Sequence, residues 1–171
     1  IGGSLCGGAG MSEKPGTTIG FERRFNRLVA SQDEQAFVRA LTASLAPQPP
    51  NFERIVSLNR GPLLTEAVSV EILLPAAVQA RLDADATLLD GGDTVAYDAA
   101  HVPGSINVTM VRAAVGTRAA WVVDPESEVV VNAETEDEAR RLARLLEAVG
   151  FRCISGLLGG GVEAWRDAGL P

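Results

Sequence analysis

Residues 87–107 read TLLDGGDTVAYDAAHVPGSIN, and this stretch carries the strongest information about the fold. It opens with a short apolar run at 87–89, which ends in an aspartate and two glycines. It closes with a His-Val-Pro-Gly turn that leads into a second short apolar run, at 105–108. Runs of this length, bounded by turn residues, are typical of buried strands. The stretch therefore predicts two strands separated by a polar connection.

Strand-like runs and helical patterns alternate through the rest of the second part of the chain. The five short apolar runs lie at residues 68–70, 87–89, 105–108, 129–131 and 153–157. Helix-spaced apolar residues lie between them, most clearly at 75–82 and 138–149. Strands that alternate with helices indicate a parallel sheet covered on both faces. The predicted fold class is therefore α/β, with a parallel sheet flanked by helices.

The first part of the chain has no strand-like runs. Residues 1–20 are rich in glycine and serine and are predicted to be a loop. The helices predicted from apolar spacing are 21–30, 33–45 and 51–59. The Gly61-Pro62 pair marks a linker. We therefore expect a mostly helical segment, 1–62, ahead of an α/β domain, 66–171.

Composition indicates a globular protein. Of the 171 residues, 46% are apolar and 22% are charged, which suits a chain that buries a core. No apolar run approaches the roughly 18 residues of a membrane span, and the first ten residues lack the basic and apolar parts of a signal peptide. We therefore expect a cytoplasmic location. The chain opens at Ile1 within a glycine-rich stretch, which indicates a fragment or a processed product.

Residues that bind metals are scarce. The two cysteines, Cys6 and Cys153, lie in different segments, so reduced thiols are expected and not a disulfide. His101 is the single histidine, so this chain cannot build a histidine-rich metal cage. Asp90 and Asp93 lie near a predicted strand end, but two carboxylates are a weak signal for Mg²⁺. No metal ligand is therefore predicted.

The net charge of −7 is concentrated in the second part of the chain. Residues 1–65 carry +2, whereas residues 66–171 carry −9. This acidity repels nucleic acid and anionic lipid, so neither is an expected partner. Solubility alone is the other explanation of the acidity.

Three blocks of the second part together resemble rhodanese domains. The first joins Leu-Leu-Asp at 88–90 to the His-Val-Pro-Gly-Ser-Ile-Asn stretch at 101–107. The second is the run at 128–131 with its following helix, and the third is Leu-Gly-Gly-Gly at 158–161 with the Ala-Trp pair behind it. The signature positions are occupied by Asp90, Gly92, His101, Gly104 and Trp165. The resemblance covers nearly all of residues 66–171 and implies the rhodanese fold.

The first part resembles a different family. Residues 3–7, GSLCG, and residues 18–26, TIGFERRFN, are similar to the stretch behind the last metal-binding histidine of metallo-β-lactamase-fold hydrolases related to glyoxalase II and persulfide dioxygenase. Residues 1–62 would then be the C-terminal fragment of such a domain, fused to the rhodanese-like domain. The resemblance implies a parent in thiol or sulfur metabolism that binds zinc or iron through residues outside this chain. No cofactor is expected in the chain itself.

The rhodanese resemblance also implies a cysteine nucleophile, which this sequence lacks. In that family the cysteine ends the fourth strand and precedes by seventeen residues the glycine that closes the next helix. Counting back from Gly150 reaches Ala133. A methyl group can neither attack sulfur nor carry it. Gly92 also replaces the arginine that the family pattern places two residues after Asp90. No catalytic residue is therefore predicted, and sulfur transfer by this route is expected to be lost.

An acidic run follows Ala133, and two explanations of it stay open. Its members are Glu134, Thr135, Glu136, Asp137 and Glu138. The four carboxylates of this run would repel thiosulfate from a remaining anion site. Alternatively, they would stabilise the next helix through its dipole and through a capping box between Thr135 and Glu138, which satisfies the loop's N–H groups within the protein. Both explanations end without catalysis.

Three further residues have a chemical and a structural explanation. His101 could act as a base, but in its turn it is predicted to bond backbone or a carboxylate near Asp90. Cys153 is predicted to be a small buried hydrophobic residue in a strand and not a relocated nucleophile. Cys6 has no neighbouring base that the sequence identifies.

The favoured interpretation is a non-catalytic rhodanese-like module of a metallo-β-lactamase–rhodanese fusion, with the parent hydrolase-like domain as its partner. A second hypothesis is residual sulfurtransferase or phosphatase activity through Cys153 or Cys6. A third is a purely structural domain that makes its parent a homodimer. A filled, acidic pocket above Ala133 favours the first and third hypotheses, and an open pocket lined by N–H groups favours the second.

Overall fold

The computed structural model describes residues 16–26, 28–29, 33–43, 47–62, 69–111 and 114–171. The chain divides into two compact units, Ile1–Gln48 and Pro49–Pro171, and each is considered by itself. Within the described ranges, none of the helices combines the length and the apolar character that a bilayer span requires.

The first unit contains two short helices, α1 (Ile19–Phe25) and α2 (Glu34–Thr42). Thr18 and Asp33 cap their N-termini through side-chain oxygens. The predicted helix 21–30 begins earlier, at Ile19, and ends earlier, because Asn26 adopts an extended backbone. Neither helix contains a buried residue. The loop predicted at 1–20 is wrong at 19–20, because Thr18 caps α1 and the helix begins at Ile19; its residues 1–15 lie outside the described residues.

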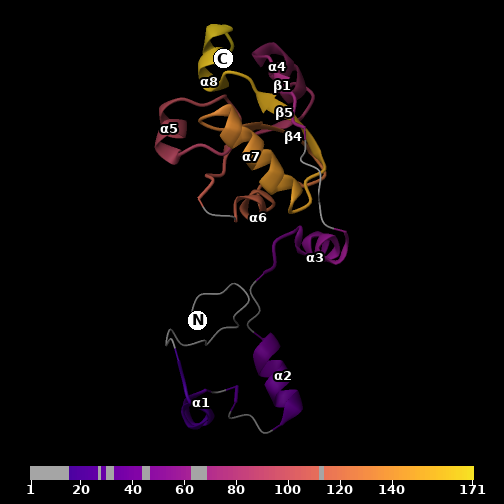
Figure 1. The fold of residues 1–171 in the computed structure, drawn as a ribbon, viewed down its shortest axis with the longest axis vertical. Coiled ribbons are helices and arrows are strands. Elements are labelled where there is room, and N and C mark those ends of the chain that lie inside the picture. The colour runs from indigo at the N-terminus through magenta and orange to yellow at the C-terminus, as the bar shows by residue number, and fades with distance from the viewer. Residues whose placement is uncertain (1–15, 27, 30–32, 44–46, 63–68, 112–113) are drawn as a thin grey trace. The chain divides into compact units, whose positions relative to one another are not determined.

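The second unit is built on a five-stranded parallel sheet in the order β1-β5-β4-β2-β3 (Figure 1). Its strands are β1 (Ile72–Leu73), β2 (Thr87–Asp90), β3 (Ile106–Asn107), β4 (Glu128–Asn132) and β5 (Cys153–Leu158). All four strand pairs are parallel. The predicted α/β fold class is confirmed. The first strand was predicted at 68–70 but is found at Ile72–Leu73, where its backbone pairs with β5; residue 68 lies outside the described ranges.

The helices of the second unit are α3 (Phe52–Arg60), α4 (Pro75–Leu82), α5 (Thr94–Ala99), α6 (Val115–Ala119), α7 (Glu136–Glu147) and α8 (Gly161–Asp167). The sheet is covered on both faces, as β4 shows. Val129 and Val131 pack with α6 and α7, whereas Val130 packs with α4 and α8. All three valines are fully buried. Alternate strand residues thus enter two separate cores, which is why the run at 129–131 is continuously apolar.

The helices of the second unit differ in part from the sequence predictions. Helix α7 begins at Glu136, two residues before the predicted start, because Thr135 provides the cap. Helix α3 lies in the same compact unit as the sheet, and this unit begins at Pro49; the domain limits at 62 and 66 stay a prediction. The short helices α5 and α6 were not predicted, because six and five residues are too few to show a helical period.

Candidate functional site

The loops that follow β2, β3 and β4 meet at the carboxyl edge of the sheet and enclose a shallow depression of about 180 Å³. In open parallel sheets this edge is where ligands bind. The depression is lined by Gly91, Gly92, Asp93, Thr109, Met110, Val111, Glu134 and Glu138. It is the place where the sequence predicted a degenerate active-site loop.

Asp90 holds the base of the depression together. It is 5% exposed, and both of its carboxylate oxygens accept hydrogen bonds. Oδ1 accepts from the Gly92 N–H at 2.7 Å, and Oδ2 accepts from the Asn132 side-chain amide at 2.7 Å. Asn107 connects β3 to this network, because its side-chain amide donates to the carbonyls of Asp90 and Gly92 at 3.2 and 3.0 Å. Asp90 therefore ties β2, β3 and β4 together.

The two glycines after Asp90 allow the loop to approach its neighbours closely. A Cβ atom at Gly91 would lie 2.9 Å from Cδ2 of Leu142, and one at Gly92 would lie 2.9 Å from Oδ1 of Asp90. Gly92 has no side chain to extend into the depression, where the family pattern has an arginine. The cationic group that this pattern would contribute to anion binding is absent at that position.

Ala133 directly follows β4. It is 8% exposed and belongs to the core on the α7 face of the sheet. Thr135 then caps α7, since its hydroxyl accepts from the Glu138 N–H at 3.2 Å. The Glu138 carboxylate accepts in return from the Thr135 hydroxyl, at 3.2 Å, and not from its backbone N–H. The predicted N-cap by Thr135 is confirmed, but among the described contacts the return bond of the predicted capping box goes to the hydroxyl and not to the Thr135 N–H. The loop satisfies the N–H of Glu138 from within.

The acidic run divides between two environments. Glu134 and Glu138 line the depression, together with Asp93. Glu136 and Asp137 are exposed in the first turn of α7 and are not among the lining residues. Glu134 also closes the loop across the site, because its Oε1 accepts from the Asp93 N–H at 3.3 Å. With three carboxylates and no lysine or arginine in its lining, the depression repels anions.

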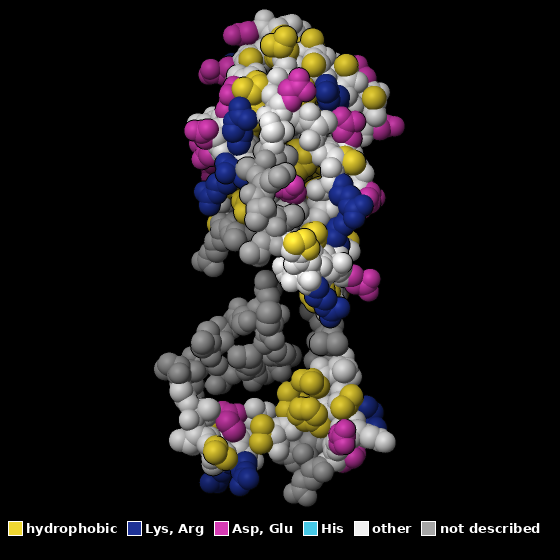
Figure 2. Space-filling view, turned by 45° about the vertical axis from the view of Figure 1, so that its right-hand side comes forward, with side chains coloured by type: hydrophobic (Ala, Val, Ile, Leu, Met, Phe, Trp, Pro, Cys, Tyr) yellow, Lys and Arg dark blue, Asp and Glu magenta, His cyan; other side chains and the backbone are white. Residues whose placement is uncertain are grey.

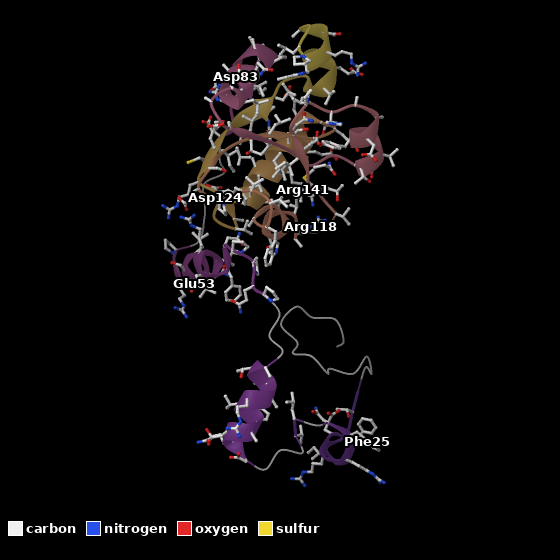
Figure 3. The ribbon with its side chains drawn as sticks, turned by 180° about the vertical axis from the view of Figure 1, so that it is seen from behind. Phe25, Glu53, Asp83, Arg118, Asp124 and Arg141 are labelled. Atoms are coloured by element: carbon white, nitrogen blue, oxygen red, sulfur yellow. The ribbon has the colours of Figure 1, made fainter. Side chains whose placement is uncertain are left out.

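The apolar wall of the depression was not predicted from the sequence. It consists of Thr109, Met110 and Val111, which follow β3. The Met110 N–H donates to the Gly91 carbonyl at 3.1 Å. Arg118 of α6, labelled in Figure 3, holds this wall from outside by donating to the carbonyls of Thr109 and Val111 at 2.5 and 3.2 Å. A single arginine in a five-residue helix gives no sequence signal of such a role.

His101 and Gly104 shape the turn before β3 and do not line the depression. His101 is exposed, its Nδ1 lies 2.9 Å from the Tyr97 carbonyl, and its ring stacks on Tyr97 with centroids 4.2 Å apart. This is the predicted backbone bond. Gly104 has φ of +77°, a conformation that glycine adopts without strain. The Tyr97 hydroxyl donates to the Ser105 carbonyl at 2.6 Å and closes the turn.

Trp165 and Cys153 lie elsewhere on the second unit. Trp165 is 3% exposed in α8, and its indole N–H donates to the Pro171 carbonyl at 2.5 Å. Cys153 begins β5, as predicted, but it is exposed and not buried, because it pairs with Glu128 at the open start of β4. At about 3.3 Å per residue, it is on the order of 16 Å from Ala133 along the strands. Cys6 lies outside the described residues.

The parallel sheet, the Asp90 network and the loop ahead of α7 define an α/β domain of the rhodanese class. Residues 74–168 match the family model of the rhodanese-like domain, and the chain belongs to this family. No curated protein matches the chain significantly.

Solved structures give two informative comparisons. The crystal structure of the Alr3790 protein from Anabaena sp. has a TM-score of 0.51 and 24% identity, and the match covers 57% of this chain and 87% of that one. A metallo-beta-lactamase from Staphylococcus aureus subsp. aureus COL has a TM-score of 0.61 and 19% identity, over 88% of this chain and 43% of that one. A polysulfide-sulfur transferase homodimer from Wolinella succinogenes is 26% identical over 60% of this chain and 77% of that one, with a TM-score of 0.48. At these levels the first two comparisons show similarity of fold.

Proposed function

We propose that the second unit is a non-catalytic rhodanese-like module, and that it belongs to a fusion with a metallo-β-lactamase-fold protein. The observation that carries the first half of this proposal is the depression at the carboxyl edge. Its lining includes the carboxylates of Asp93, Glu134 and Glu138, while Ala133, which precedes Glu134, is buried in the core.

Sulfur transfer by a rhodanese route needs a thiolate that can attack sulfane sulfur and carry it as a persulfide. Ala133 offers only a methyl group at the position where the family pattern places that cysteine. Donors such as thiosulfate are anions, and three carboxylates around the depression raise the electrostatic cost of binding them. The site therefore lacks both the nucleophile and the field that the reaction requires.

The fusion is supported by the extent of the staphylococcal match. That match covers 88% of the 171 residues, or about 150, whereas the second unit holds only 123. It therefore extends into the first unit. The present chain spans less than half of the staphylococcal protein's length.

The surface of the first unit fits the same proposal. In α2, Phe37, Val38 and Leu41 are 36%, 49% and 41% exposed, and yellow side chains gather on this part of Figure 2. Amphipathic helices gain most of their stability by burying such a face. In the proposed parent, the rest of the hydrolase domain covers α2 and holds zinc or iron through its own residues. The parent would then act in thiol or sulfur metabolism.

The activity half of the proposal is tested by cyanolysis assays with thiosulfate and with 3-mercaptopyruvate. We expect no saturable turnover above background from this chain. Turnover that Cys153→Ser abolishes would contradict the proposal and support the hypothesis of a relocated nucleophile.

The fusion half is tested separately by reading the sequence that encodes the residues ahead of Ile1. A metallo-β-lactamase HxHxDH motif is expected there, and an unrelated upstream sequence would contradict the fusion.

A further inference from the structure

The depression at the carboxyl edge has an apolar side as well as an acidic one. Met110 and Val111 lie in its wall, and Val111 is 63% exposed. Val95, two residues after Asp93 in the first turn of α5, is 76% exposed. Exposed valines therefore lie at the depression in the segments that follow β2 and β3. Apolar side chains left open at a concave surface gain free energy when a partner covers them.

Each of the three carboxylates in the lining is held by one hydrogen bond within the chain. Asp93 Oδ1 accepts from the Val95 N–H at 2.8 Å, and Glu134 Oε1 accepts from the Asp93 N–H at 3.3 Å. Glu138 Oε2 accepts from the Thr135 hydroxyl at 3.2 Å. The other oxygen of each carboxylate has no hydrogen bond among the described residues, and the described ion pairs all lie elsewhere. The depression thus presents three oriented carboxylates, each with an open oxygen.

The charge and the size of the depression favour a single cationic side chain as its ligand. Three carboxylates outweigh the roughly half positive charge at the N-terminus of α7, so the site attracts cations. Within the described ranges, no three histidine, cysteine or acidic side chains are placed to share a metal ion. An extended donor therefore suits these carboxylates better than one ion. The volume of about 180 Å³ is below the roughly 300–1,000 Å³ of small-molecule pockets and suits one long side chain.

An arginine side chain matches both the acidic and the apolar surface. Its planar guanidinium has five N–H donors that bind carboxylate oxygens in pairs. Its alkyl chain packs on apolar groups such as Met110 and Val111 while the charged end reaches the carboxylates. The chain has no such group of its own at this place, because Gly92 stands where the family pattern has an arginine. A partner can therefore supply the cation that the loop lacks.

We propose that the depression is a docking site for an arginine side chain in an extended, basic segment of a partner protein. The guanidinium binds the carboxylates of Glu134 and Glu138, the alkyl chain lies on Met110 and Val111, and Val95 contacts the neighbouring part of the segment. The inference rests on the proposed function in one respect, which is that the depression no longer serves sulfur transfer. The two are tested separately, since cyanolysis measures turnover and the experiment below measures binding.

A peptide titration of the full 171-residue chain, followed by amide chemical shifts in NMR, tests the docking site. The probe is the blocked peptide Gly-Ala-Arg-Ala-Gly. The amide signals of Gly91, Gly92 and Met110 should shift and saturate as the peptide is added. The same peptide with citrulline in place of arginine keeps the shape of the side chain and loses its charge. It should bind at least about tenfold more weakly, because the ion pairs are lost.

Two double variants locate the binding. Glu134→Gln/Glu138→Gln removes two charges from the lining but retains an oxygen for each internal hydrogen bond. It should bind the arginine peptide about tenfold more weakly. Glu136→Gln/Asp137→Asn is the matched control, since it removes two charges from the first turn of α7 outside the depression. At about 0.15 M salt it should change the affinity by no more than about twofold.

Arg112 follows Val111 in the sequence, so a second series uses Arg112→Gln, in which this arginine cannot compete for the carboxylates. Equal binding of the arginine and citrulline peptides, or an equal loss in both double variants, would overturn the inference. So would Mg²⁺ that shifts the same amides as far as the peptide at the same concentration, because the site would then accept any cation. The citrulline comparison needs no variant and remains decisive if a double variant fails to fold.

Discussion

Two loops at the same edge of the sheet relate differently to the rhodanese pattern. The loop after β2 keeps the aspartate of that pattern. The buried Asp90 side chain binds Gly92 and Asn132 of β4, and its backbone carbonyl accepts from Asn107 of β3. The loop after β4 departs from the pattern, with Ala133 followed by an acidic run that continues into the first turn of α7. The first loop contributes buried hydrogen bonds between strands, and the second is where the family pattern places its catalytic cysteine. On the proposed function, the second loop has lost its catalytic residue while the fold is kept, because Thr135 still provides the start of α7.

The largest predicted effect concerns the Asp90 network. Asp90→Asn places an amide donor against the Asn132 amide donor and removes a buried charge-assisted bond. We expect the free energy of unfolding, measured by urea denaturation, to fall by about 2–4 kcal/mol.

The double variant Asp90→Asn/Asn132→Asp exchanges donor and acceptor and serves as the control. It restores a complementary pair between β2 and β4, so it should recover part of the loss. If Asp90→Asn is as stable as the unmodified chain, the loop after β2 does not hold the sheet, and the contrast between the two loops disappears.

A medium effect is predicted for the cap of α7. Thr135→Ala removes the hydroxyl that accepts from the Glu138 N–H and should cost about 0.5–2 kcal/mol of stability in the same denaturation experiment. Thr135→Ser retains the hydroxyl and should remain close to the unmodified chain. An equal loss in both variants would show that packing of the threonine methyl group, and not the cap, explains the effect.

The smallest effect separates the two parts of the acidic run. Neutralising Glu136 and Asp137, which are outside the depression, should lower stability by a few tenths to about 1 kcal/mol each, less at high salt. Glu134→Gln/Glu138→Gln is the matched pair inside the depression. Calorimetric titration with sulfate should detect no binding to the chain with Glu136 and Asp137 neutralised, and none to Glu134→Gln/Glu138→Gln. Sulfate affinity that appears only in Glu134→Gln/Glu138→Gln would mean that the carboxylates close a working anion site, and the non-binding interpretation would be wrong.

Local sequence patterns predicted most of the strands of the second unit. The runs at 87–89, 129–131 and 153–157 all lie in strands, because burial on both faces leaves a continuous apolar run. The Thr135 cap was also readable, because its partner is three residues away. β1 was placed too early, since Val70 is buried without belonging to a strand.

The parts that the sequence did not reveal depend on tertiary position. Cys153 was expected to be buried, and its exposure follows from its place at the open end of β5 and not from its neighbours in sequence. Met110 and Val111 line the depression because the loop after β3 folds against Gly91, a contact across about twenty residues. The bonds of Asn51 and Arg54 to the carbonyls of Val149 and Gly150, which follow α7, span nearly one hundred residues and have no local signal.

The burial of Trp165 also has an optical consequence. The chain contains two tryptophans, of which Trp165 is 3% exposed and Trp121 is 52% exposed. An indole enclosed by apolar side chains, with its N–H bonded to a carbonyl, emits at shorter wavelength than one in water. Acrylamide should therefore quench Trp121 first and leave the blue-shifted emission of Trp165. That remaining signal reports the corner where α8 meets Pro171, and it would follow the unfolding of this corner without an added label.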